Sequence, residues 1–268
     1  MSSDGLCLDH SWLSYAITIH ADLVRGHLWE NELPMKKFLA GLVVVGLGFA
    51  GTSLTASAAS SKSDLDGRLA AATAVINEVM AVPDKAIPDQ ITQKATCIAV
   101  VPSMKKGAFV VGAQYGQGVV TCRTPHGWSA PVFIRIAGGS FGFQIGGQAT
   151  DLVIVAVNQK GFQDLLKNKV KLGGDVAASA GPVGRNAQAG TDWKLNAELL
   201  TYSRSKGLFA GIDLTGDDVS QNLDDTTTFY NGNNNTFDSI LHGNVAVPDS
   251  AKPFVRTVAK YFHSTQDQ

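Results

Sequence analysis

The residues that could carry out catalysis or bind a metal are few and widely spaced. Downstream of residue 58 the histidines are His126, His242 and His263, and none has the H-E-x-x-H or H-x-x-x-H spacing of a zinc site. The same region contains neither a G-x-S-x-G elbow nor a G-x-x-x-x-G-K-[ST] phosphate loop. These patterns predict a protein that is not an enzyme and that holds no metal and no cofactor.

A hydrolase that uses paired carboxylates is the one enzyme class that stays open. Asp213, Asp217 and Asp218 follow an apolar run and could supply such a pair. The same stretch is also typical of a strand that leaves the core and enters a polar turn. A hydrolase without a familiar motif is therefore kept as a lesser alternative.

Cys97 and Cys122 are the two cysteines downstream of residue 58, whereas Cys7 lies upstream. Each of the two adjoins a β-branched run, so they could be neighbours in a sheet and form one disulfide in an oxidising compartment. Two buried free thiols explain the same positions equally well.

Positive charge is concentrated in the middle of the chain. Residues 85–206 contain ten Lys and four Arg against five Asp and one Glu, a net charge of +8, whereas residues 207–268 carry −5. Such a region would attract an anionic surface, although any single lysine is better explained as a solvated side chain. The candidate lipid ligands are Lys105 and Lys106 in an expected loop, Lys160, Lys167, Lys169 and Lys171 on or after an expected helix, and Arg185, Arg204 and Lys206. Arg185 could instead be a structural partner of Asp151 or Asp192.

The segment from Met35 has the three parts of a secretory signal peptide. A basic Met-Lys-Lys start precedes the thirteen-residue apolar run 38–50, which is shorter than the ~20 residues of a spanning helix. Ala56-Ser57-Ala58 fits the A-x-A cleavage pattern, with Ser57-Ala58-Ala59 as the neighbouring option.

Three segments follow from this interpretation. We expect residues 35–58 to be the signal peptide, residues 59–268 to be the mature periplasmic or secreted protein, and residues 1–34 to be an extension upstream of the true start. In the alternative, residues 1–34 belong to the protein and residues 39–50 form an inverted anchor or a buried strand.

The periodicity of the mature region predicts the elements that position these residues. Ser63 is expected to cap an amphipathic helix whose apolar positions include Leu65, Leu69, Ile76 and Met80. Packing of this helix on the core is the usual outcome, and insertion into a membrane is the alternative.

Strands and further helices follow that first helix. Short β-branched and aromatic runs punctuated by glycine predict strands over residues 97–158. A short second helix is expected to start at Pro88. A middle helix is expected over residues 162–170, a hairpin turn at residues 205–207, and two more helices at residues 237–241 and 250–262. The predicted fold is a single compact α+β domain. It has a glycine-rich, mostly antiparallel curved sheet or barrel-like core flanked by N-terminal, middle and C-terminal helices.

Seven blocks of sequence in their order and spacing resemble the SYLF family, also called Ysc84-like, over residues 64–262. They are Lys106–Gly112, Gly127–Pro131, Gly138–Gly146, Asp151–Val153, Leu172–Asp175, Ala180–Arg185 and Tyr202–Gly211.

The resemblance implies binding to anionic lipids, phosphoinositides in eukaryotic members, through basic surface and an N-terminal amphipathic helix. Some fungal relatives also bind actin, a partner that an exported bacterial protein would not meet. We therefore expect peripheral binding to an anionic phospholipid membrane, with no nucleic-acid partner. A structural or stress-related role in the cell envelope, through a protein partner, is the alternative, because a basic face serves either.

Overall fold

A computed structural model describes residues 60–81, 87–165, 167–184, 197–205, 208–212, 214–233 and 235–263. All of them belong to one compact unit, Ala58–Gln268, so a chain that begins at Ala59 retains every described element. The predicted signal peptide and upstream extension, Arg185 and Lys206 lie outside the described residues.

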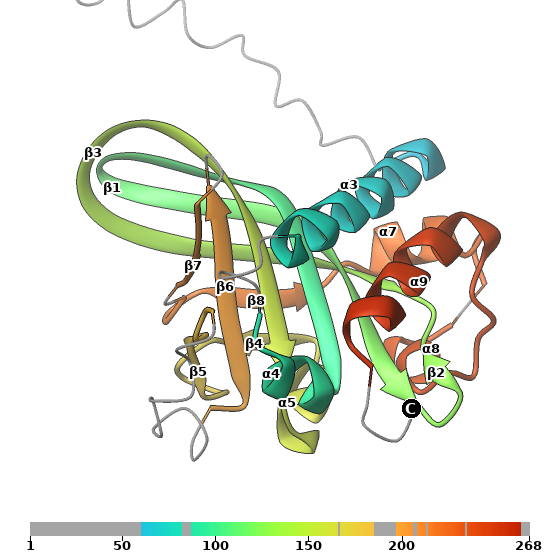
Figure 1. Cartoon of the computed structure of the whole chain (residues 1–268). Helices are drawn as coiled ribbons and strands as arrows, with labels where there is room; N and C mark the ends of the chain where they lie inside the picture. The colour runs from blue at the N-terminus through green and yellow to red at the C-terminus, as the bar shows by residue number, and fades with distance from the viewer. Residues whose placement is uncertain are drawn as a thin grey trace, which may run out of the picture. The chain divides into compact units, whose positions relative to one another are not determined.

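Helices begin and end this unit, and most of its strands lie between them in the sequence (Figure 1). The helices are α3 (Lys62–Met80), α4 (Asp89–Lys94), α5 (Gln159–Leu165), α7 (Leu223–Phe229), α8 (Phe237–Leu241), the 3-10 helix η2 (Asp249–Ala251) and α9 (Lys252–Tyr261). The strands are β1 (Cys97–Thr124), β2 (Gly127–Trp128), β3 (Val132–Ala156), β4 (Lys169–Lys171), β5 (Ala178–Ala180), β6 (Leu199–Ser205), β7 (Leu208–Gly211) and β8 (Asp218–Gln221).

One long antiparallel hairpin, β1 with β3, organises the sheet. The two strands pair from Cys97 opposite Ala156 to Val120 opposite Val132, with two irregularities in register. Strand β8 pairs with β3 at residues 134–137, and strand β6 pairs with β3 at residues 151–156. The sheet is therefore mostly antiparallel and curved, and the predicted α+β fold class is confirmed.

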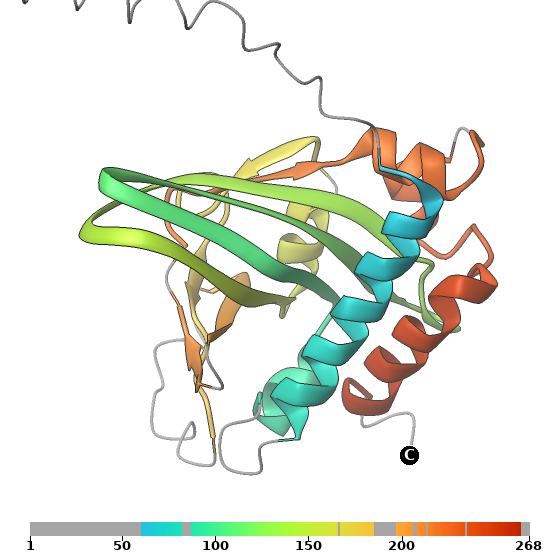
Figure 2. The same ribbon diagram turned by 90° about the horizontal axis from the view of Figure 1, so that it is seen from above.

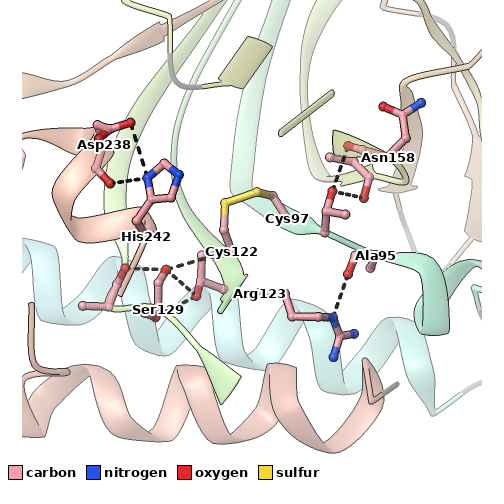
Figure 3. The surroundings of a disulfide bond; sticks show 12 residues. Ala95, Cys97, Cys122, Arg123, Ser129, Asn158, Asp238 and His242 are labelled. Carbon is pink, nitrogen blue, oxygen red and sulfur yellow. Dashed lines mark hydrogen bonds and ion pairs between the residues drawn. A yellow bond between two sulfur atoms is a disulfide. The ribbon is translucent and has the colours of Figure 1, made fainter. Parts of the chain in front are cut away.

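The hairpin ribbon doubles back, so the end of β1 returns to its beginning (Figures 1 and 2). The backbone N–H of Arg123 donates to the carbonyl of Thr96 at 2.7 Å. Next to that bond, Cys97 and Cys122 form a disulfide with their Cα atoms 4.0 Å apart (Figure 3). Of the two alternatives that the sequence left open, the structure has the disulfide.

Glycines make the close approach of the two halves of β1 possible. A Cβ atom at position 118 would lie 2.3 Å from the carbonyl oxygen of Val100, and one at position 116 would lie 2.5 Å from Val101 Cγ1. Such distances exclude any side chain, so the self-packing of β1 requires glycine at both positions.

Helix α3 lies across this ribbon and beside α9 (Figure 2). Its N-cap is Ser61, whose hydroxyl accepts from the backbone N–H of Asp64 while the Asp64 carboxylate accepts from the backbone N–H of Ser61. This capping box starts the helix two residues before the cap predicted at Ser63.

The apolar positions of α3 belong to the core of the domain. Leu65, Leu69 and Ile76 are at most 1% exposed, and Met80 packs on the core while partly exposed. Of the two outcomes considered for this helix, the structure therefore has packing on the core.

A buried ion pair fixes α3 to two other elements. Arg68 Nη1 lies 2.6 Å from Asp225 Oδ2 on α7, with side chains only 11% and 6% exposed. Arg68 Nη2 donates to Gln117 Oε1 on β1 at 2.7 Å, and the guanidinium lies 5.5 Å from the centre of the Phe133 ring. A single side chain thus joins the first helix to the ribbon and to the C-terminal helices.

Three expectations about the elements need correction. Lys105 and Lys106 lie inside β1, opposite Ala149 and Gln148, because the strand continues through the polar residues that suggested a loop. The runs predicted as separate strands between residues 97 and 158 are parts of β1 and β3. The middle helix ends at Leu165, and Val170 belongs to β4, where it pairs with Val219.

Two predictions about elements near the C-terminus agree with the structure. Strands β6 and β7 form the predicted antiparallel hairpin. Helix α8 has the predicted bounds, and α9 with η2 covers the last predicted helix.

Loss of the disulfide should destabilise the domain without changing its fold. Replacing both Cys97 and Cys122 by alanine is expected to lower the free energy of unfolding by about 3 kcal/mol, because the bond closes a loop between residues 25 apart. Urea denaturation of the oxidised protein, the reduced protein and the double variant measures this loss. Equal stability of all three would contradict a stabilising role for the bond.

Removal of the buried guanidinium should be costly in the same assay. Arg68→Met is expected to lower the free energy of unfolding by about 3 kcal/mol, because it leaves the Asp225 carboxylate buried without its cation. Lys169→Met, which removes the exposed partner of Asp218, is the control, with an expected loss of about 1 kcal/mol or less. Similar losses of unfolding free energy in the two variants would show that the buried ion pair stabilises the fold no more than the exposed one does.

Candidate functional site

The lysines predicted on and after the middle helix lie on α5, the following turn and β4. Lys160 forms ion pairs with Glu198 and, at 3.7 Å, with Asp164. Lys167 Nζ lies 2.5 Å from Asp164 Oδ1, so one carboxylate that is only 5% exposed serves two lysines. The hydrogen bond from Lys160 to Glu198 raises the pKa of that lysine.

A further ion pair continues this pattern on the neighbouring strand. Lys169 on β4 lies 3.0 Å from Asp218 on β8. Three of the four clustered lysines are thus neutralised by nearby carboxylates. Lys171 is exposed and has no ion pair among the described residues.

Lys105 and Lys106 differ from that cluster. Both are on β1, their cross-strand neighbours Ala149 and Gln148 are uncharged, and no carboxylate of the described residues pairs with either. The exposed Lys105 and the half-buried Lys106 therefore carry uncompensated positive charge.

Arg204 has a structural role in the described part of the chain. Its Nε and Nη2 atoms donate to Asp151 Oδ2 at 3.2 and 2.9 Å, and its Nη1 atom pairs with Glu78. The guanidinium thus ties β6 to β3 and to α3. Asp151, one of the partners considered for Arg185, is bound by Arg204 instead.

The carboxylates considered for hydrolysis have different interaction partners. Asp217 is 1% exposed and accepts a hydrogen bond from Gln114 Nε2, whereas Asp218 pairs with Lys169. Asp213 lies outside the described residues. Asp217 and Asp218 thus serve different contacts and do not form a pair that shares one substrate position.

An open cleft lies beside the disulfide, and the sequence patterns did not indicate it (Figure 3). It has a volume of about 340 Å³ and is lined by Thr96, Arg123, Thr124, Pro125, Gln159 and His242. The Arg123 guanidinium donates to the carbonyls of Ala95 and Phe262 and stacks 4.8 Å from the Trp128 ring.

Metal-ligand clusters and membrane-spanning helices are both absent from the described residues. No group of three or more His, Cys, Asp and Glu side chains there could hold a metal ion. Within the same residues, no helix is long and apolar enough to cross a membrane.

Comparison with known proteins shows which family and which proteins the chain is similar to. Residues 137–261 match the model of the family Ysc84, described as "Las17-binding protein actin regulator". The match runs from β3 to α9, so Lys105, Lys106 and the disulfide lie before it.

The relatives extend the similarity over a larger part of the chain. SH3 domain-containing YSC84-like protein 1 of Xenopus laevis is 38% identical over 172 residues, which are 63% of this chain and 51% of the relative. Its Rattus norvegicus counterpart is also 38% identical over 172 residues, 63% of this chain and 50% of the relative. Protein YSC84 of Saccharomyces cerevisiae is 34% identical over 177 residues, 65% of this chain and 37% of the relative.

The chain thus spans about half the length of the vertebrate relatives and 37% of the yeast one. The names of the family and its members refer to binding, regulation and an SH3 domain, and none refers to a catalysed reaction. Together, the family model and the relatives support a Ysc84-family, or SYLF, domain in this chain.

Proposed function

We propose that this domain binds anionic lipid at a membrane surface and catalyses no reaction. The observation that carries the proposal is the uncompensated charge of Lys105 and Lys106, which lie side by side in sequence on the ribbon. Lys160, Lys167 and Lys169, in contrast, are neutralised by their own carboxylates and attract an anionic surface less.

The strength of this attraction limits what the two lysines can do alone. A basic residue near an anionic membrane contributes about 1 kcal/mol, so the pair contributes about 2 kcal/mol. Such binding is weak, reversible and sensitive to salt. A stable attachment requires further contacts beyond this pair.

Helix α3 stays docked in the proposed complex. Insertion of its apolar face into lipid would first remove Leu65, Leu69 and Ile76 from the core and break the Arg68–Asp225 ion pair. The loss of that buried contact area exceeds what two surface lysines can offset.

A protein partner is the second candidate, and the family description favours it because it names Las17 binding. An exported protein would use the same basic surface for an acidic envelope protein in place of lipid.

Export to an oxidising compartment is also part of the proposal. The signal-like sequence from Met35 to Ala58 supports it, and so does the disulfide, since such bonds persist mainly outside the cytosol.

The lysine pair should matter more than the neutralised lysines. For the chain from Ala59, K105Q with K106Q is expected to weaken binding to phosphatidylglycerol or cardiolipin vesicles roughly thirtyfold, from about 1 kcal/mol per lysine. Co-sedimentation at low and moderate salt, with phosphatidylcholine vesicles as the neutral reference, measures the change.

K167Q with K169Q removes the same net charge and is the matched control. It is expected to weaken binding less than about threefold, because the carboxylates already cancel these lysines. An equal loss of vesicle affinity in both double variants would show that only the net charge of the protein matters. Absence of vesicle binding by the unmodified protein would reject the lipid proposal in favour of a protein partner.

Export makes a separate prediction about the N-terminus. When the full sequence is expressed in a bacterium, the periplasmic protein is expected to begin at Ala59, or at Ser60 if the neighbouring site is used. Intact-mass measurement of the periplasmic fraction determines the start. Ala58→Phe should abolish cleavage at the first site, and an uncleaved protein in the unmodified case would argue against a signal peptide.

A further inference from the structure

The part of the β1–β3 hairpin that turns back differs from the rest of the sheet. We call residues 107–113 of β1 and 139–147 of β3 the ribbon bend. In the described sheet these residues pair only with each other, whereas β8 joins β3 at residues 134–137 and β6 joins it at residues 151–156. Figures 1 and 2 show the bend extending away from α7, α8 and α9.

The ribbon bend has an unusual composition for a projecting two-stranded structure. Its sixteen residues comprise six glycines, eight apolar or aromatic residues, one Ser and one Gln, and they include no charged residue. A two-stranded ribbon is marginally stable in water, and uncharged apolar strands with open edges tend to associate. This composition is better matched to a less polar neighbour than to bulk water.

Charged residues and an exposed tyrosine lie where the bend begins and ends on β1. Lys105 and Lys106 directly precede it on β1, and Tyr115, 46% exposed, follows it on the same strand. Beside Tyr115, the Gln114 side chain donates a hydrogen bond to the buried carboxylate of Asp217. This bond links the second half of β1 to the residue that precedes β8. The arrangement is an uncharged tip with cations and an exposed aromatic ring at its base, the distribution of residues across a membrane interface.

We propose that the ribbon bend inserts into the interfacial layer of an anionic bilayer while Lys105 and Lys106 contact lipid phosphates at its base. This inference rests on the proposed function and supplies the contact that two lysines alone lack. Insertion is shallow, because the open strand edges carry N–H and C=O groups that hydrocarbon cannot satisfy. A depth of about 5–10 Å below the headgroups is compatible with this limit.

The depth of the bend can be measured with an environment-sensitive fluorophore. In the chain from Ala59, S140C and, separately, F141C are labelled with nitrobenzoxadiazole; the two native cysteines are buried and bonded to each other. Because adjacent strand residues face opposite sides, the two labels sample both faces of the ribbon. The label at exposed Ala259 on α9, as A259C, is the control.

With phosphatidylglycerol vesicles, we expect at least one bend label to shift to the blue and to be quenched by lipids brominated on their acyl chains. The control label is expected to do neither. If the labelled proteins sediment with the vesicles in a salt-sensitive manner but both bend labels stay unquenched, insertion is rejected and the lipid-binding function stands. If they do not sediment at all, both proposals fail.

A pair of variants tests whether the bend contributes to affinity. F141S with F143S is expected to weaken vesicle binding at least about tenfold, since each phenyl group transferred from water contributes a favourable free energy. L208S with L223S makes two apolar-to-serine changes elsewhere, at residues that are 68% and 56% exposed, and should leave binding unchanged. Circular dichroism spectra and melting curves establish that both variants are folded.

A second copy of this chain is the competing occupant of the bend. If the bend mediates self-association, F141S with F143S abolishes a dimer seen by analytical ultracentrifugation without lipid, and vesicle affinity stays at the level of the unmodified protein. That result overturns the membrane assignment. A monomer whose affinity for vesicles falls in the same variant supports it.

Discussion

Closure of β1 onto its own beginning is the constraint on which the rest of the fold depends. The bond from Arg123 N–H to the Thr96 carbonyl brings the two ends of a 28-residue strand together, and the adjacent disulfide makes that closure covalent. The ribbon must then bend, and its halves must pass close enough to exclude side chains at Gly116 and Gly118. Since β3 follows the same path, its two halves point to different neighbours, β8 and β6.

The distribution of charge follows from this geometry more than from the composition. A net charge of +8 over residues 85–206 suggested one broad basic face. Folding places Glu198 and Asp164, which that sum already includes, beside Lys160 and Lys167, and it places Asp218 from outside the span beside Lys169, so the excess positive charge lies elsewhere. Among the candidate lysines, Lys105, Lys106 and Lys171 have no ion pair with the described residues, and only Lys105 and Lys106 are adjacent in sequence.

The sequence was sufficient for features that depend on local periodicity. The buried stripe of α3, the bounds of α8 and the β6–β7 hairpin follow from apolar spacing and turn residues. Local patterns failed where a long-range contact decides the outcome. Lys105 and Lys106 resemble loop residues until β3 pairs with them. The helix cap is a different case, because Ser61 replaces Ser63 through a local contact with Asp64, three residues after it.

Less of the candidate site than of the fold could be predicted from the sequence. The cations were found by type, but their carboxylate partners are distant in sequence. Asp151 lies 53 residues before Arg204, and Glu78, its other partner, lies further still. The cleft beside the disulfide combines residues from position 96 to position 242, and no spacing rule connects them.

The packing of α3 against α9 has a consequence for the order in which the chain can fold. The first described helix and the last one contact each other, so the core of the domain is incomplete until residues 252–261 have been made. A chain that leaves a narrow translocation channel from its N-terminus would therefore have to keep the apolar face of α3 uncovered until the final turns emerge. For such a chain, completion of the fold waits for the release of the C-terminal residues.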